Sequence, residues 1–249
     1  MRIVVVGGTG LIGSQVVEIL GARGHDVVAA APATGVDTIT GQGVAASLAG
    51  ADAVVDVTNR MAFEPAAVMD FFTTSTTTLL TAGREAGVRH HVVLSIVGTD
   101  RLSHPGYLDA KAAQERLVAR SGIPFTIVRA TQFFEFLATI GAGLAEGDSV
   151  VLPAADLQPI AAAEVAAVLA DVVTATPVDG AVEIAGPERA SFAEFVGPAL
   201  AAQGDHRPVR EDAGVGYFGV PIVRDSLVPV GDARIARTSF RHWSTAQVS

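Results

Sequence analysis

Residues 3–13 have the sequence Ile-Val-Val-Val-Gly-Gly-Thr-Gly-Leu-Ile-Gly. The first four residues are apolar and mostly β-branched, which is typical of a buried strand. Apolar residues then recur at helical spacing over residues 11–23, at Ile12, Val16 and Leu20. A strand, a glycine turn and a helix in this order predict the first unit of an α/β fold.

The glycines of this turn fit two spacings at once. Gly8, Gly10 and Gly13 form G-x-G-x-x-G, and Gly7, Gly10 and Gly13 form G-x-x-G-x-x-G. Such a turn lets the backbone approach a pyrophosphate, and the N-terminus of the following helix supplies free N–H groups and a partial positive charge. A merely tight turn is the alternative. We interpret the turn as a dinucleotide site, with backbone contacts from Gly7, Thr9, Gly10, Leu11, Ile12 and Gly13.

The next hundred residues alternate strand-like and helix-like segments. Strands are expected at residues 3–6, 27–31, 36–39, 53–57, 92–95 and 125–129, and helices at 11–23, 44–48, 65–85 and 107–121. The helix at 65–85 is expected despite the threonine-rich run 73–78, because apolar residues flank that run. This order requires parallel strands with helices on both faces, so the fold class is α/β, a doubly wound parallel sheet of the Rossmann type.

Beyond residue 130 the alternation is less regular. Helices are expected at 132–145, 162–175 and 191–203, and edge strands at 150–152 and 182–185. Residues 205–249 are expected to form an irregular lobe with its own small core around Tyr217, Phe218, Phe240 and Trp243. We therefore expect one Rossmann-type domain over residues 1–249, with the nucleotide-binding part at about 1–130 and a small C-terminal substrate-binding lobe mainly at about 186–249.

Composition excludes several classes of protein. The chain has no cysteine, which excludes disulfides, zinc–thiolate sites, iron–sulfur clusters and cysteine nucleophiles. Its net charge of −9 argues against nucleic-acid binding, and no histidine spacing predicts a metal site. No apolar run reaches about 18 residues, so no membrane span is expected. Without a signal-peptide pattern, a soluble cytoplasmic protein is expected.

Polar residues with catalytic potential follow the later strands. Tyr107 and Lys111 are four residues apart, so on a helix they share one face. An ammonium beside a phenol favours the phenolate and lowers its pKa, and such a tyrosine can exchange a proton with a carbonyl oxygen. Ser95 ends one strand, and Thr58 and Asn59 follow another, at the edge where such sheets bind ligands. A surface tyrosine and a solvated lysine are the alternative.

The cofactor preference is not visible in the side chains. The second strand ends in Ala30, Ala31 and Pro32, and no Lys or Arg occurs between Arg23 and Arg60. Neither an acid for a ribose 2′-hydroxyl nor an arginine for a 2′-phosphate is present at the usual place. The cofactor prediction is therefore NADP or NAD.

The sequence resembles the atypical short-chain dehydrogenase/reductase superfamily, and more closely its NmrA-like branch of NAD(P)-binding proteins. The resemblance rests on residues 7–13, 90–98, 107–111 and 123–134. It implies that the phosphate turn is at Gly7, Gly10 and Gly13 and that the catalytic residues are Ser95, Tyr107 and Lys111. It further implies that Lys111, Ala130 and Thr131 contact the cofactor, and that Gln132, Phe133 and Phe134 contact the substrate. Phe133, Phe134 and Phe136 form an apolar cluster, and we expect core packing for at least one of them and a substrate contact for another.

We accordingly expect an NAD(P)H-dependent oxidoreductase that reduces a carbonyl, a quinone or a similar small apolar substrate, with Tyr107 as proton donor. Two alternatives stay open. One is a non-catalytic NAD(P)-sensing regulator that binds a protein partner, although such members of the branch often lack the Tyr and Lys. The other is an enzyme similar to nucleotide-sugar epimerases. The helix from Pro65 offers a surface for a homodimer.

Overall fold

The apolar segment near the N-terminus lies inside a seven-stranded sheet. In spatial order the strands are β12 (Ala233–Ile235), β9 (Gly180–Ala185), β5 (Phe125–Ala130), β4 (His90–Ile96), β3 (Ala53–Asp56), β1 (Arg2–Val6) and β2 (Asp26–Ala30). The strand registers described for this sheet are all parallel. Ile3, Val4 and Val5 are completely buried, as expected of a strand covered on both faces. The predicted α/β fold with a Rossmann-type parallel sheet is confirmed.

The computed structural model describes residues 1–60, 64–102 and 105–246, and these residues form two compact units. The first unit consists of Met1–Ser95, Pro105–Arg129 and Val165–Val182. The second unit consists of Ile96–His104, Ala130–Glu164 and Glu183–Ser249. The glycine turn and the residues around Tyr107 therefore belong to the first unit.

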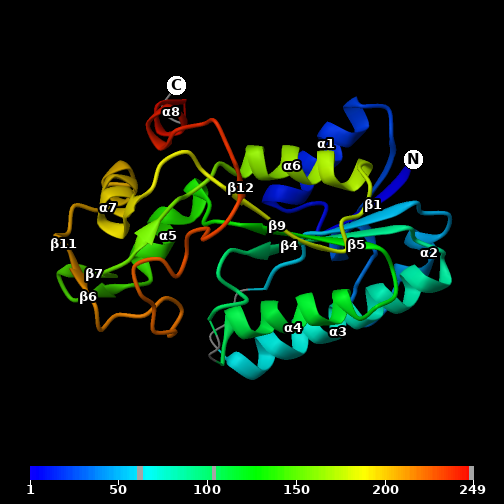
Figure 1. Ribbon diagram of the computed structural model, residues 1–249, viewed down its shortest axis with the longest axis horizontal. Helices are drawn as coiled ribbons and strands as arrows, with labels where there is room; N and C mark the ends of the chain where they lie inside the picture. The colour runs from blue at the N-terminus through cyan, green and yellow to red at the C-terminus, as the bar shows by residue number, and fades with distance from the viewer. Residues whose placement is uncertain (61–63, 103–104, 247–249) are drawn as a thin grey trace. The chain divides into compact units, whose positions relative to one another are not determined.

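Helices cover both faces of the sheet in the first unit. These helices are α1 (Leu11–Ala22), α2 (Val44–Leu48), α3 (Pro65–Glu85), α4 (Tyr107–Ala119) and α6 (Ala162–Thr174), the last of which begins in the second unit. In Figure 1, α1 and α6 lie on one side of the sheet, and α3 and α4 lie on the other. One core cluster joins Val54 and Val93 of the sheet to Leu79 of α3 and Val118 of α4. This packing fixes α4 over the strands whose ends carry the candidate site.

Helix α3 has the bounds expected from the sequence, in spite of its threonines. Val68 and Phe72 are buried among its apolar residues. Thr73 Oγ1 donates to the Met69 carbonyl at 2.8 Å, and Ser75 Oγ donates to Thr38 Oγ1 at 2.8 Å. Packing of the helix, together with the tertiary hydrogen bond between Ser75 and Thr38, offsets the low helix propensity of this run.

Four secondary-structure predictions are corrected. The α-helix expected at 132–145 is limited to Leu137–Ala142, and Ala145 lies in a short strand. Residues 36–39 form no strand, because the Asp37 carboxylate accepts the N–H groups of Ile39 and Thr40 and so holds a turn. The segment at 182–185 belongs to β9, which lies between β12 and β5 and is not an edge strand. The segment at 150–152 belongs to β7, the middle strand of a separate sheet.

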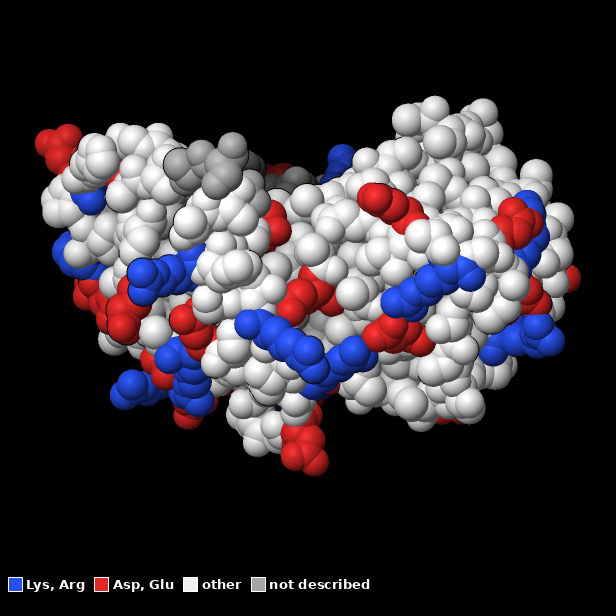
Figure 2. Space-filling view, turned by 90° about the horizontal axis from the view of Figure 1, so that it is seen from above, with Lys and Arg blue, Asp and Glu red and all other residues white. Residues whose placement is uncertain are grey.

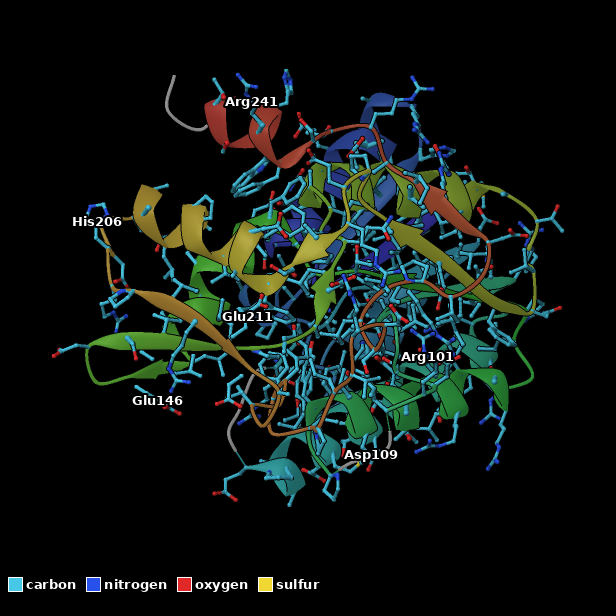
Figure 3. All side chains as sticks on the ribbon, turned by 60° about the vertical axis from the view of Figure 1, so that its left-hand side comes forward. Arg101, Asp109, Glu146, His206, Glu211 and Arg241 are labelled. Carbon is cyan, nitrogen blue, oxygen red and sulfur yellow. The ribbon has the colours of Figure 1, made fainter. Side chains whose placement is uncertain are left out.

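The second unit contains the remaining elements. A three-stranded sheet has the order β11 (Val209–Asp212), β7 (Ser149–Pro153) and β6 (Ala145–Glu146), and a two-stranded one pairs β10 (Ala190–Ser191) with β8 (Asp156–Leu157). Its helices are α5 (Leu137–Ala142), α7 (Phe192–Ala202) and α8 (Phe240–Ala246). Glu146 on β6 and Glu211 on β11 are labelled in Figure 3. The predicted capping box at Ser191 and Glu194 is present at the start of α7.

The C-terminal tail, residues 205–249, does not have the separate aromatic core that the sequence predicted. Phe240 stacks on Trp243 and contacts Phe195 of α7, with ring centroids 6.0 and 5.8 Å apart. Tyr217 instead contacts Phe192 of α7. The aromatic residues of the tail are thus divided between two clusters, one with Phe192 of α7 and one with Phe195 of α7 and Phe134.

Figure 2 shows basic and acidic side chains interspersed on the face in view. Within the described residues, none of the helices combines the length and the apolar character that crossing a membrane would require.

Candidate active site

The glycine turn between β1 and α1 has a geometry that side chains would disrupt. Gly7 has φ +83°, and a Cβ there would lie 3.0 Å from the Val57 carbonyl oxygen. A Cβ on Gly13 would lie only 2.1 Å from the Gly7 carbonyl oxygen. These close approaches bring the start of α1 against the strand ends, which is the arrangement that a pyrophosphate-binding turn needs.

The N-terminus of α1 is open to an anion. Thr9, Gly10 and Leu11 are exposed, and Gly10 at the N-cap position has no side chain that could bond the first N–H groups. The first turn carries no acidic residue. Ile12 and Gly13 complete the turn as buried residues. The exposed backbone donors and the helix dipole fit a diphosphate, and residues 7–13 are the ones that would hold it.

The region after β2 gives no preference between the two dinucleotides. Thr34 Oγ1 accepts the Ala31 N–H at 2.9 Å and bonds backbone carbonyls, and Asp37 holds the turn described above. Both side chains therefore form hydrogen bonds with nearby backbone groups, and neither indicates a preference for NAD or NADP.

Tyr107 begins α4 and faces the end of β3. Its hydroxyl donates to Asn59 Oδ1 at 2.7 Å, and its ring packs edge-to-face on Phe72. Burial raises the pKa of the Tyr107 phenol above its ordinary value. The sequence predicted the opposite shift, on the assumption that Lys111 acts on the phenol. The phenol therefore keeps its proton at neutral pH.

Lys111 is the only lysine among the 17 Lys and Arg residues of the chain. Its Nζ donates to the Leu94 carbonyl at 2.7 Å and to Gln114 Oε1, and it lies 4.7 Å from the centre of the Phe72 ring. Burial lowers the pKa of Lys111 to about 8. A cation this deeply buried is rare among lysines, which points to a specific use for the amine.

Ser95 belongs to a neighbouring hydrogen-bond network. Its Oγ donates to Glu115 Oε1 at 2.5 Å. The Arg129 guanidinium donates to the same carboxylate, from Nε to Oε1 at 3.0 Å and from Nη2 to Oε2 at 2.7 Å. The hydroxyl proton of Ser95 is thus already used in the hydrogen bond to Glu115.

Thr58 is held by Asp56, the last residue of β3. Asp56 Oδ1 accepts the Thr58 N–H at 2.9 Å and the Thr58 hydroxyl at 2.7 Å. Asp56 Oδ2 accepts Gln114 Nε2 at 3.0 Å. The structure therefore brings Thr58, Asn59, Tyr107 and Lys111 into one network.

The sequence analysis missed three members of this region: Asp56, Gln114 and Glu115. Gln114 and Glu115 follow Tyr107 by seven and eight positions, so the helical face that predicted Lys111 also contained them.

The residues predicted to line the nicotinamide and substrate lie in the second unit. Val97 N–H donates to the Ala130 carbonyl at 3.0 Å, and Thr131 Oγ1 donates to the Gln158 carbonyl at 2.7 Å. Gln132 is buried, and its side-chain amide has no described partner.

The phenylalanines of that stretch have different surroundings. Phe133 is half-buried and stacks on exposed Phe136. Phe134 is 2% exposed and packs against Phe240 and Trp243. Core packing of at least one of the three is confirmed.

A family described as NAD(P)H-binding matches residues 7–176, most of the chain. The protein belongs to this NAD(P)H-binding family. The predicted NAD(P) cofactor is therefore confirmed, with the choice between NAD and NADP still open, and the turn at residues 7–13 opens the matched region.

Solved structures of the same fold include enzymes and dinucleotide complexes. MoeE5, solved in complex with UDP-glucose and NAD, has a TM-score of 0.71 at 19% identity, with 100% of each chain covered. The NADPH-dependent quinone oxidoreductase of Escherichia coli has a TM-score of 0.67 at 15% identity, over 99% of this chain and 100% of that one. At these identities the likeness shows the fold that the NAD(P)H-binding family shares.

A curated relative is the photosystem II assembly factor Ycf39 of Synechocystis, which is 25% identical over 151 residues. The match covers 55% of this chain and 46% of that protein, so the chain spans less than half of the relative's length.

Proposed function

We propose that this protein is an NAD(P)H-dependent oxidoreductase that reduces a carbonyl, a quinone or a similar small apolar substrate, with Tyr107 as the proton donor. Membership of the NAD(P)H-binding family supports the cofactor. The fold shared with the quinone oxidoreductase supports the class of reaction. The tyrosine mechanism rests on the geometry of this chain alone.

The observation that carries the proposal is the state of the Tyr107 phenol. It is partly buried, hydrogen-bonded to Asn59, and one helical turn before a buried lysine. Because burial raises its pKa, the phenol is protonated at neutral pH. A proton donor for carbonyl reduction needs this form, whereas oxidation of an alcohol needs the phenolate as a base. The phenol therefore favours the reductive direction.

The roles of the protein groups follow from their contacts. The turn at residues 7–13 would hold the diphosphate of the dinucleotide, whose nicotinamide supplies a hydride when bound. The Tyr107 hydroxyl gives its proton to the substrate oxygen, so that hydride and proton together convert a carbonyl to an alcohol. Two of the three N–H groups of the Lys111 ammonium are used within the protein, which leaves one for a ribose hydroxyl.

Ser95 is proposed as the anchor of the substrate oxygen, and this role requires its hydroxyl proton to leave Glu115. In the alternative that the contacts favour, Ser95 positions Glu115 and Arg129. The Ser95→Ala variant separates these roles, as described in the Discussion.

The test is oxidation of NADH and NADPH, followed by absorbance, with a panel of carbonyl compounds and quinones. We expect turnover by the wild type and a loss of about 100- to 10,000-fold in kcat for Tyr107→Phe, the usual size of a general-acid contribution. Equal rates for the two proteins would remove Tyr107 from the mechanism.

A second candidate is an enzyme acting on a nucleotide sugar, favoured by the fold shared with MoeE5, which was solved with UDP-glucose. Such chemistry begins by oxidising a hydroxyl and needs a base, so the Tyr107 phenol would have to lose its proton first. Turnover of UDP-glucose without added NAD(P)H would favour this candidate. Tight dinucleotide binding without turnover of any substrate would favour the non-catalytic regulator.

A further inference from the structure

The side-chain amide of Gln114 separates a buried cation from a buried anion. Its Oε1 accepts from Lys111 Nζ, and its Nε2 donates to Asp56 Oδ2 at 3.0 Å. Gln114 is 1% exposed and Lys111 is 3% exposed, so water does not replace either bond. Because the amide has one acceptor end and one donor end, only this orientation satisfies both charges.

Asp56 connects the Gln114 amide to the loop that follows β3. Its second oxygen holds Thr58 through two hydrogen bonds. Thr58 precedes Asn59, whose side chain accepts the Tyr107 hydroxyl. Since Tyr107 and Lys111 lie on α4, the contacts form a closed ring between α4 and the end of β3.

We propose that Gln114 is a positioning residue that, with Asp56, holds the Lys111 ammonium, the Tyr107 hydroxyl and the loop at Val57–Asn59 as one unit. This inference rests on the proposed function in one respect, namely that Lys111 and Tyr107 serve the dinucleotide and the substrate. Gln114 acts through other residues and is not itself a catalytic residue.

The groups that face Lys111 determine how the loss of Gln114 would act. Asp56 on β3 and Glu115 on α4 favour the ammonium, and burial opposes it. Glu115 is itself paired with Arg129 of β5. His91 of β4 is a further buried group, and burial lowers its pKa.

An aromatic ring also lies against the Lys111 ammonium. Helix α3 presents the Phe72 ring, and Tyr107 precedes Lys111 on α4 with its hydroxyl on Asn59. Without the Gln114 amide, the ammonium keeps the Leu94 carbonyl as its described hydrogen-bond acceptor. The pKa of Lys111 should then fall further, because the charged form loses a bond.

The single lysine allows a direct measurement. Protein labelled with ¹⁵N-lysine gives one side-chain signal, whose pH titration reports the pKa of Lys111. We expect a titration near 8 for the wild type. The Gln114→Leu variant should titrate lower, and Gln114→Glu should titrate higher because it adds a negative charge at the same place.

The matched control is Asp109→Asn, which removes a charge from the outer face of the same helix. Asp109, labelled in Figure 3, is partly exposed and pairs with Arg116 at 3.9 Å. This variant should leave the Lys111 titration unchanged. If Gln114→Leu does not show a native thermal transition, Gln114→Glu and Asp56→Asn test the same ring, and Asp56→Asn should lower the pKa of Lys111.

The second readout is the pH dependence of dinucleotide binding. Gln114→Leu should weaken NAD(P)H binding by about tenfold, the equivalent of one hydrogen bond to a charged group, and shift its pH profile together with the Lys111 titration. A wild-type Lys111 that titrates near its ordinary value would overturn the proposal, as would Gln114 variants that move neither the titration nor the binding. Shifted titrations without NAD(P)H oxidation by any variant would support the positioning role and refute the oxidoreductase.

Discussion

Replacing Gly13 by alanine tests the turn that opens the NAD(P)H-binding region. The added Cβ would lie 2.1 Å from the Gly7 carbonyl oxygen, whereas side chains do not approach backbone oxygens within 3.0 Å. The start of α1 and the turn must therefore separate by about 1 Å in a closely packed region. A misplacement of about 1 Å in a positioning element can lower the rate of a reaction about 100-fold, and we apply the same factor to the affinity for the dinucleotide. We expect the dissociation constants of NADH and NADPH to rise by that factor, equivalent to about 2.7 kcal/mol.

The assay is calorimetric titration of each dinucleotide, with thermal unfolding measured on the same samples. Overpacking at Gly13 should also lower the stability by about 1–3 kcal/mol, which is about 2–4 °C in Tm for each kcal/mol. Gly21→Ala is the control on the same helix, because a Cβ there meets no atom within 4 Å. That variant should bind normally and gain up to about 1 kcal/mol from helix propensity. Wild-type affinity of Gly13→Ala for both dinucleotides would show that the turn at residues 7–13 does not hold the diphosphate.

Three further predictions concern α4 and its neighbours. Glu115→Gln removes the carboxylate that pairs with Arg129 in a site where both side chains are nearly buried. Chemical denaturation should therefore show a loss of about 3–5 kcal/mol, against less than about 1 kcal/mol for Asp109→Asn. In Ser95→Ala, a drop in kcat at unchanged Tm would establish Ser95 as the substrate anchor, whereas a drop in Tm at unchanged kcat would establish it as a support for Glu115. The pKa of Lys111 is about 8 in the folded chain and ordinary in the unfolded one, so the unfolded state binds more protons between these values. The free energy of unfolding should therefore rise from about pH 8 to about pH 10 in the wild type and lose this rise in Lys111→Met; the same slope in both proteins would contradict the assignment.

Local sequence patterns were sufficient for most of the fold. The β-branched run at β1 and the apolar spacing of α1 are local signals, and both elements form as predicted. The strand expected at 36–39 failed because the Asp37 side chain bonds the backbone two residues on, which hydrophobic periodicity does not reveal. The tail core failed because its aromatic partners lie on α7, outside the tail.

The site was predictable where its residues share one helix. The spacing of Tyr107 and Lys111 indicated a common face, and the structure places both in one network. Asn59 lies 48 positions from Tyr107 in the chain, and Asp56 lies 58 positions from Gln114, so their hydrogen bonds depend on tertiary packing. The direction of the Tyr107 pKa shift likewise depends on burial, which residue spacing does not report.

The proposed function depends on binding of the NAD(P)H diphosphate by the turn at residues 7–13. Crystals of the wild-type protein grown with NADH or NADPH test it most directly. We expect diphosphate oxygens within hydrogen-bond distance of the backbone N–H groups of Leu11 and Ile12 at the N-terminus of α1, because the Gly10 N–H already donates to the Gly7 carbonyl at 3.0 Å. A dinucleotide bound elsewhere, with this turn left without a phosphate, would contradict it.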